Sequence, residues 1–409
     1  MNIMKNKKIN ILSQYYYPDI ASTGQLMTEL AEELSKLGKD VTVFTAKPAY
    51  FKKSDAPKFE IHNDVKINRT FCINADKNNS FGRALNTISF ITSIFFKLLF
   101  LDRKAVNLIV SNPPFLHFIG YFLYILRKQK YALLVYDIYP DVAVILNYFK
   151  KESLVVKIWD WLYKKAISHS SKTIVLSEGM KELILSKFSD RKPIVEKVSI
   201  IHNWADAKFF RYIPKEENYF IKKYNLANKY VLLYSGNLAL YNSFDTMLEA
   251  AKLTEDSDTL FLIIGNGGRR KEIEEYVSNH SLKNVRIMDY FPFEELPYSI
   301  SSGDVLFITV RDGINGINMP SKQYTIMACG KPVIALGKKD GDVHNMLKEA
   351  KCGLFVEQGD TKALLEAIDF YRQNPEIAKE HGLNGRKYFE DHYTLKIISK
   401  EYYELLSGI

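Results

Sequence analysis

The sequence predicts an α/β protein built from two doubly wound, parallel-sheet domains. Short apolar runs of strand length alternate with longer segments whose apolar residues recur at helical spacing, a pattern typical of parallel sheets covered by helices. The alternation starts afresh at Tyr230, after a polar, proline-containing stretch at 202–218. The chain has 409 residues, which is long enough for two domains.

The first half opens with a strand at 9–13, followed by a helix whose leucines, from Leu26 to Leu37, recur at helical spacing. Gly38 is a natural end for this helix. Five further apolar runs predict strands at 41–45, 107–111, 132–136, 173–176 and 198–201. We therefore expect a first domain over residues 1–205.

The second half repeats the pattern. Its apolar runs predict strands at 230–235, 259–264, 285–288, 304–308, 332–336 and 353–356. They define a second domain over residues 206–389, and we expect a C-terminal helix at 390–409 to pack back onto the first domain. Ligands of doubly wound folds bind beyond the carboxyl ends of the strands, so we expect the functional residues in the loops that face a cleft there.

Composition excludes several classes of protein. The chain is 47% apolar and 25% charged, as in ordinary globular proteins, and its three cysteines are too few for a disulfide framework or a zinc site. The histidines are scattered, so no metal site is expected. No signal-peptide pattern is evident at the start, and a cytoplasmic location is the expectation.

Charge is unevenly distributed along the chain. Residues 1–205 hold 30 lysines and arginines against 18 acids, and the remainder holds 26 against 29. A basic surface can face nucleic acid or anionic lipid, or can simply be solvated. We favour lipid over nucleic acid, because the basic residues form no recognisable nucleic-acid-binding motif.

Two apolar stretches, 81–101 and 115–126, are too short to span a membrane. Both fit buried core helices. The first is rich in phenylalanine and contains Arg83 and Lys97, so it also fits a helix that lies in a membrane interface. We expect peripheral attachment to the inner face of the cell membrane.

Glycines and cations in the second half indicate a phosphate site. Gly236 with Asn237 and then Gly265 follow strands, where glycine lets backbone amides approach a phosphate closely. Arg311 follows another strand. The segment 319–336 is predicted to be a helix and then a strand, with Ser321 as a capping residue and Lys322 beside the helix start. Together these residues predict a diphosphate site.

Two carboxylates follow the predicted strand at 132–136. Asp137 and Asp141 could orient an acceptor hydroxyl or take its proton. For Asp141, the alternative is a purely structural position at the next turn.

The chain resembles a known family along nearly its whole length. The matching stretches are QYYYPDIASTGQLMTELAEELSKLGKDVTVFTAKP, YDIYPDVAVILNYF, IHNWAD, YSGNLALYNSFDTMLEAA, IGNGG, MPSKQYTIMACGKPVIA and GDVHNMLKEAKCGLFVEQGD. Together they are similar to the retaining glycosyltransferases of family 4, which have the GT-B fold. Within that family, they resemble the subgroup that builds capsule and O-antigen units on polyprenyl diphosphate.

This resemblance implies a nucleotide-diphosphate sugar donor, a UDP-sugar, and a lipid-linked glycan acceptor, with no metal or other cofactor. Ser321 and Lys322 belong to a Pro-Ser-Lys segment of the subgroup, so the helix start after Pro320 would face the donor. Gly24 would offer its amide to the distal phosphate, with Thr23 and Gln25 beside it on the acceptor side. Asp342 falls where many relatives carry an acid.

The sequence departs from the family pattern at two places. The usual pair of glutamates would fall at Ile317 and Thr325, so Thr325 can offer only a hydroxyl to the donor ribose. The usual cations after the Gly236 loop are also missing, with Asn237 and Asn242 nearby instead. Lys322 and Arg311 are therefore the expected phosphate cations, and Lys322 with Asp137 the expected catalytic residues.

Two alternatives share the predicted fold. A UDP-GlcNAc 2-epimerase would turn over a UDP-sugar without an acceptor, using acidic and histidine side chains in the cleft. A non-catalytic scaffold of a polysaccharide assembly complex would fit the missing glutamates. We favour a retaining glycosyltransferase because the matching stretches run nearly end to end.

Overall fold

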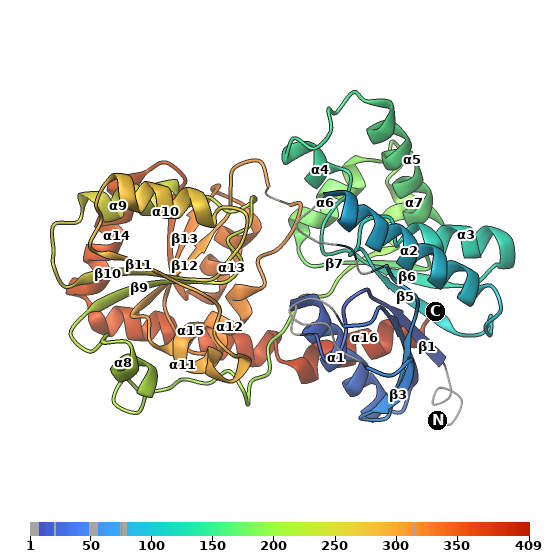
Figure 1. Cartoon of the computed structure of the whole chain (residues 1–409), viewed down its shortest axis with the longest axis horizontal. Helices are drawn as coiled ribbons and strands as arrows, with labels where there is room; N and C mark the ends of the chain where they lie inside the picture. Colours follow the sequence, from blue (N-terminus) through green and yellow to red (C-terminus); the bar gives the residue numbers. More distant parts are fainter. Residues whose placement is uncertain (1–7, 20–21, 49–55, 74, 76–79, 315) are drawn as a thin grey trace. The chain divides into compact units, whose positions relative to one another are not determined.

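The computed structural model describes residues 8–19, 22–48, 56–73, 75, 80–314 and 316–409. The chain forms two compact units (Figure 1). The first comprises the residues up to His202 together with Leu395–Ile409, and the second comprises Asn203–Thr394. The chain thus passes into the second unit inside the polar stretch that separates the two repeats in the sequence.

The first unit is built on an eight-stranded sheet in the order β3-β4-β2-β1-β5-β6-β7-β8. The strands are β1 (Lys8–Leu12), β2 (Asp40–Thr45), β3 (Phe59–His62), β4 (Val65–Arg69), β5 (Val106–Val110), β6 (Tyr131–Leu134), β7 (Lys172–Val175) and β8 (Val198–Ile200). All neighbours are parallel except β3 and β4. The six strands predicted in this half are present, each within two residues of its expected bounds.

The hairpin of β3 and β4 was not predicted. Its turn consists of Asn63 and Asp64, both with positive φ, between the paired residues His62 and Val65. Two-residue hairpin turns of this kind favour Asn and Asp at both positions. The Asn-Asp pair between two short alternating runs was therefore a usable signal in the sequence.

Helices cover the sheet of the first unit. They are α1 (Ser22–Lys36), α2 (Ser80–Leu98), α3 (Phe118–Arg127), α4 (Asp141–Ile145), α5 (Leu154–His169), α6 (Glu178–Ser186), α7 (Lys192–Val195) and α16 (Leu395–Ser407). The helix α16 packs against α1, and Lys39 donates a hydrogen bond to Ser407 over 2.6 Å. The C-terminal helix thus belongs to the first unit, although it follows the second in the chain.

The apolar stretch at 81–101 forms the amphipathic helix α2. Phe90, Ile94 and Leu98 are buried, whereas Ile88 and Phe96 are exposed. One face of α2 is therefore core, as a buried helix requires, and the other is free for contact. None of the helices formed by the described residues is long and apolar enough to cross a membrane.

The second unit has a six-stranded, fully parallel sheet in the order β11-β10-β9-β12-β13-β14. The strands are β9 (Tyr230–Ser235), β10 (Thr259–Ile264), β11 (Val285–Met288), β12 (Val305–Thr309), β13 (Val333–Gly337) and β14 (Gly353–Glu357). All six strands were predicted, and β9, β10 and β11 have the predicted bounds. The strand order reverses direction between β9 and β12.

The helices of this unit form two layers around the sheet. They are α8 (Tyr219–Lys223), α9 (Asp245–Leu253), α10 (Arg270–Asn279), α11 (Leu296–Ser301), α12 (Lys322–Ala328), α13 (Asp342–Ala350), α14 (Thr361–Gln373) and α15 (Pro375–His392), with a 3-10 turn, η1, at Phe293–Glu295. The helices α9, α10 and α14 lie on one face, and α12 and α15 on the other (Figure 1). In doubly wound sheets, ligands bind beyond the carboxyl ends of the strands, at the point where the strand order reverses. Here that point lies between β9 and β12.

Candidate functional site

The predicted glycine loops meet at the carboxyl edge of the second sheet. The N–H of Gly236, just after β9, donates to the carbonyl of Ile264 at the end of β10 over 2.9 Å, and Leu238 N–H donates to Asn266 over 3.0 Å. The loop after β9 therefore lies directly against the loop after β10. Arg311 follows β12 at the same edge, and its backbone N–H donates to Tyr241.

Gly265 is required by this contact between the loops. Its φ is +151°, and a Cβ at this position would lie 2.0 Å from the carbonyl oxygen of Gly236. Any larger residue would push the two loops apart. The sequence suggested that these glycines open the backbone to a phosphate, which stays a prediction, and the structure adds a packing reason for Gly265.

Lys322, the first residue of α12, reaches back over the loop after β9. Its Cε would lie 3.3 Å from a Cβ added at Gly236. Its Nζ donates to the Tyr234 hydroxyl over 2.5 Å and lies 3.8 Å from the centre of the Tyr234 ring. A cation above an aromatic face is held by the ring quadrupole, so Lys322 is fixed beside Gly236.

The Tyr234 hydroxyl that holds Lys322 is itself fully bonded. It donates to the carbonyl of Asn237 over 2.8 Å and accepts a second hydrogen bond from the Asn242 side-chain amide over 2.8 Å. Asn242 also donates to the Asn237 carbonyl over 2.9 Å. Asn237 was predicted to belong to the phosphate site, Asn242 was noted only as a replacement for a missing cation, and Tyr234 was not predicted. Asn242 therefore has a structural role: it orients the Tyr234 hydroxyl, which binds Lys322.

Burial lowers the pKa of Lys322 to about 7. Among the residues that the structure describes, no carboxylate forms an ion pair with it. A half-buried lysine without a counter-charge gains from an anion that supplies one. The geometry and the charge of this position therefore favour an anionic ligand.

The other cations at this edge differ in whether carboxylates neutralise them. Arg269 and Arg270 follow the Gly265 loop, but Arg269 pairs with Asp245 and Glu272, and Arg270 pairs with Glu274 and Asp289. Arg311 is exposed, and no carboxylate within the described part of the chain pairs with it. Lys322 and Arg311 are thus the two candidate phosphate cations that the structure leaves available here.

Three other predicted residues belong to α12 or its approach. Ser321 occupies the N-cap position of α12, as predicted, but it is exposed, has helical φ and ψ, and makes no side-chain capping bond. Ile317, where the family would have a glutamate, is buried. The Thr325 hydroxyl donates to the Lys322 carbonyl over 2.9 Å, one turn back in its own helix. Thr325 must therefore leave this bond, or share its oxygen, to contact a ligand.

Asp342 is the first residue of α13, after Gly341. It is half-buried near Tyr324. Burial of Tyr324 is the main cause of the raised pKa of that phenol, and the Asp342 carboxylate adds to it. Asp342 therefore lies beside α12, on the element that follows β13.

The acceptor-side residues lie in the first unit. The Ser111 hydroxyl accepts the backbone N–H groups of Tyr136, over 2.9 Å, and Asp137, over 3.4 Å, which fixes the loop after β6. Asp137 is half-buried in this loop. Asp141 begins α4 and pairs with Lys187 over 2.5 Å. This ion pair favours the structural interpretation of Asp141, while a part in acceptor binding stays a prediction.

The remaining predicted residues are in the first turn of α1. Gly24 is buried, and a Cβ there would lie 3.2 Å from the carbonyl of Asp19. Thr23 is half-buried, and Gln25 donates to Glu29 over 3.1 Å. These positions bring Gly24 close to the preceding loop, which is compatible with a required glycine.

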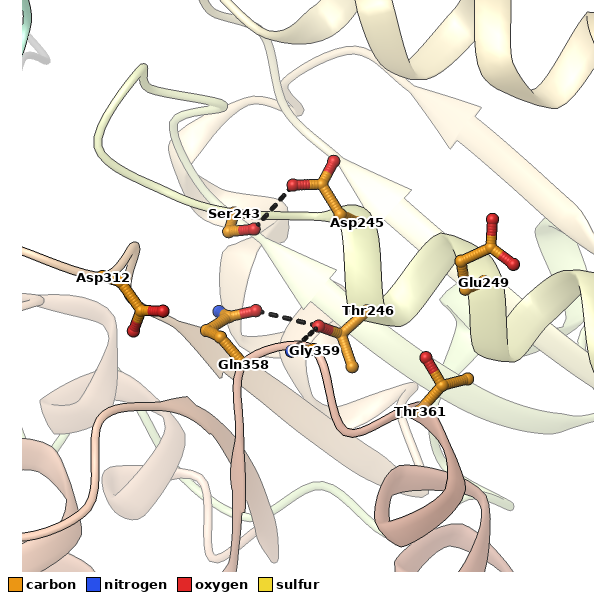
Figure 2. A pocket seen from close by; sticks show the side chains of 8 residues that line it. All are labelled: Ser243, Asp245, Thr246, Glu249, Asp312, Gln358, Gly359 and Thr361. Atoms are coloured by element: carbon orange, nitrogen blue, oxygen red, sulfur yellow. Dashed lines mark hydrogen bonds between the residues drawn. The ribbon is translucent and has the colours of Figure 1, made fainter.

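A separate pocket of about 330 Å³ opens on the second unit (Figure 2). It is lined by Ser243, Asp245, Thr246, Glu249, Asp312, Gln358, Gly359 and Thr361. Thr246 holds one wall together, donating to Gln358 over 3.0 Å and accepting the N–H of Gly359 over 2.8 Å (Figure 2). None of the predicted site residues lines this pocket. Its three carboxylates would repel a diphosphate, so it is not the predicted phosphate site.

Among the residues described by the structure, no group of three or more His, Cys, Asp or Glu side chains could hold a metal ion.

Known proteins resemble this chain in sequence and fold. Residues 216–388 match the family model described as glycosyl transferases group 1. The chain is 26% identical over 298 residues to the probable glycosyltransferase WbjE of Pseudomonas aeruginosa, covering 72% of this chain and 73% of WbjE. It is 22% identical over 403 residues to the putative colanic acid biosynthesis glycosyl transferase WcaI of Escherichia coli, covering 94% of this chain and 95% of WcaI.

Among solved structures, Anabaena HepE in complex with UDP and glucose superimposes with a TM-score of 0.73 at 14% sequence identity, covering 98% of this chain and all of HepE. At this level of identity, the superposition shows the fold and not the ligand. The matched family region contains every second-unit residue of the predicted site, from Gly236 to Asp342.

Proposed function

This chain is a glycosyltransferase of the GT-B fold with a glycosyl transferases group 1 domain at residues 216–388, and we propose a specific reaction for it. The enzyme transfers a sugar from a UDP-sugar to a glycan carried on polyprenyl diphosphate, with retention of anomeric configuration. The reaction belongs to the biosynthesis of a capsule or O-antigen polysaccharide. The observation that carries this proposal is Lys322: a positioned cation beside Gly236 that lacks a carboxylate partner among the described residues.

Lys322 has the properties that departure of a nucleoside diphosphate requires. As the bond from the anomeric carbon to the diphosphate breaks, negative charge grows on the leaving oxygens. A cation already held in place stabilises that charge without reorganisation at the moment of reaction. Tyr234 and Asn242 keep Lys322 in place, and the exposed Arg311 adds a second cation at the same edge.

In this proposal, the other site residues bind the acceptor and the remaining parts of the donor. The acceptor oxygen bonds to the anomeric carbon on the face from which the diphosphate leaves, and the reaction needs no nucleophile from the protein and no metal ion. Asp137 orients the acceptor hydroxyl or accepts its proton. We assign Thr325, Ser321 and Asp342 to binding of the nucleotide and sugar, and Gly24 to binding of the distal phosphate.

Two comparisons support the choice of substrates. HepE, which shares the fold, was solved with UDP and glucose. WcaI is named for colanic acid biosynthesis, and its similarity extends over nearly the whole chain. A lipid-linked acceptor would keep the enzyme at the inner face of the cell membrane, attached peripherally.

A panel of nucleotide sugars tests the donor part of the proposal. We expect UDP-sugars, in the presence of a chelator, to raise the melting temperature, because a ligand at ~100 times its dissociation constant adds about 2.7 kcal/mol of stability. The stabilising sugar is then assayed for transfer to a lipid-linked acceptor. If no nucleotide sugar stabilises the protein, the non-catalytic scaffold becomes the better explanation, since Ile317 and Thr325 replace the two acids of the family.

A further inference from the structure

Helix α5 of the first unit has two apolar faces. Val156, Trp159 and Tyr163 point into the core and are buried. On the opposite side, Leu154 and Ile158 are 71% and 50% exposed. Trp161 continues this exposed face one turn later and is 53% exposed. Large side chains at i, i+4 and i+7 form one continuous stripe along a helix.

We call the three residues Leu154, Ile158 and Trp161 the α5 surface. Tyr148 and Phe149, which follow α4, are also exposed, but the Phe149 ring packs against the buried Trp159, with the ring centres 6.3 Å apart, and so does not continue the stripe.

Positive charge surrounds the α5 surface. Residues 148–165 contain five lysines, Lys150, Lys151, Lys157, Lys164 and Lys165, against the acids Glu152 and Asp160. Asp160 is already neutralised, because its carboxylate pairs with Lys164 over 2.8 Å and Lys187 over 3.0 Å. With Lys164 used in that pair, Lys150, Lys151, Lys157 and Lys165 remain against Glu152, so the net charge of this segment is positive.

The exposed face of α2 is the competing surface, and α2 was the interfacial helix expected from the sequence. Phe81, Ile88 and Phe96 are exposed there. Its basic residues are Arg83 and Lys97, and Lys97 donates to Asn68 and has a pKa lowered by burial. We favour α5 because residues 148–165 contain more basic side chains than α2 does.

We propose that the α5 surface docks onto an anionic lipid bilayer. This inference deepens the proposed function and rests on it, because an acceptor carried on a lipid must be met at a membrane. Tryptophan favours the interfacial region of a bilayer, and amphipathic helices with a basic polar face insert their apolar side there. Lysines beside the stripe can reach the phosphate headgroups while their stems cover apolar surface.

Trp161 provides a direct probe of this contact. The chain has three tryptophans, and Trp159 and Trp204 are buried. We expect vesicles of phosphatidylcholine with 30% phosphatidylglycerol to shift the tryptophan emission to shorter wavelength, and brominated lipid to quench it. Trp161→Phe should remove both changes while leaving vesicle binding largely intact. A wild-type spectrum unchanged by vesicles that bind the protein would place the contact elsewhere.

Matched variants locate the surface by vesicle flotation. We expect Leu154→Ser with Ile158→Ser and Trp161→Ser to lower the vesicle affinity at least ~10-fold, since each apolar side chain of this size is worth such a factor when fully inserted. The control, Ile88→Ser with Phe96→Ser on α2, should bind as the wild type does. If the control loses binding and the α5 variant keeps it, the proposal is wrong and α2 is the docking helix.

Charge and oligomeric state complete the test. Wild-type binding should weaken as salt rises and be absent with pure phosphatidylcholine, because the lysines are screened or have no partner. If gel filtration instead shows that the wild type is a dimer and the α5 variant a monomer, with vesicle binding unchanged, the α5 surface is an interface between two copies.

Both variants should retain stabilisation by the nucleotide sugar. If the α5 variant loses vesicle binding but is still stabilised by the nucleotide sugar, the substitutions affect membrane docking and not the donor site. If no nucleotide sugar stabilises the wild type, the proposed function is wrong, and the vesicle-binding result is unaffected.

Discussion

Donor binding should take up a proton at Lys322. The pKa of this lysine is lowered to about 7 by burial, so a large share of the free protein holds it uncharged at pH 8. A diphosphate beside the ammonium favours the charged form and raises the pKa in the complex. The complex then holds more protons than the free protein above pH 7, and affinity must fall as the pH rises.

The size of the effect follows from the pKa in the free protein. With a bound-state pKa well above 8, binding takes up ~0.5 proton at pH 7 and ~0.9 proton at pH 8, and the dissociation constant rises toward tenfold per pH unit. Nucleotide sugars suit this measurement because both phosphates are esterified and do not titrate near neutral pH. Titration calorimetry in two buffers of different ionisation enthalpy gives the proton uptake directly.

Two lysine variants make the experiment specific. Lys322→Met should abolish the uptake and reduce kcat/KM by ~10²–10³, the cost of losing one preorganised electrostatic group. Lys338→Met, which removes an exposed lysine just beyond β13, should change neither quantity. If the wild type binds a nucleotide sugar at pH 8 without taking up a proton, Lys322 does not contact the diphosphate, and the proposed site is wrong.

Three further predictions concern other parts of the site. Thr325→Glu should keep or tighten nucleotide binding, because the longer acid can reach a ribose; loss of binding in a folded variant, measured by calorimetry, would mean that the pocket has been rebuilt. Gly265→Ala should destabilise the protein by more than ~2 kcal/mol in chemical unfolding, because its Cβ would lie 2.0 Å from the Gly236 carbonyl, whereas Gly337→Ala, whose Cβ would meet nothing nearer than 3.7 Å, should cost under ~1 kcal/mol. Asp137→Asn should lower kcat for transfer at least ~10² while leaving the donor dissociation constant unchanged, and normal turnover would remove it from the acceptor side.

The sequence allowed most of the fold to be predicted because the parallel strands are nearly continuous apolar runs. β9, β10 and β11 lie between polar segments, which makes their ends visible in the sequence. β3 and β4 were not predicted, because this edge hairpin is only partly buried and its apolar residues alternate with charged ones. Edge strands carry a weaker hydrophobic signal than central ones.

The site was less predictable than the fold. Lys322 stood out through its place beside a helix start, but Tyr234 looked like one more residue of an apolar strand. Its importance comes from contacts with Asn242, across the loop after β9, and with Lys322, which is 88 residues away in the sequence. Likewise, the pairs of Arg269 with Asp245 and of Arg270 with Asp289 form only in the fold, whereas their pairs with Glu272 and Glu274 are local in the sequence.

The position of α16 has a consequence for the order of events during synthesis. The ribosome finishes the whole second unit before it makes Leu395–Ser407, a delay of roughly 10–40 s at about 5–20 residues per second. Throughout that interval, the side of α1 that α16 will cover is open, although every strand of the first unit has already emerged. In the nascent N-terminal half, this side of α1 is thus exposed to chaperones and proteases until α16 has been made, which is later than the synthesis of the last strand of the first sheet.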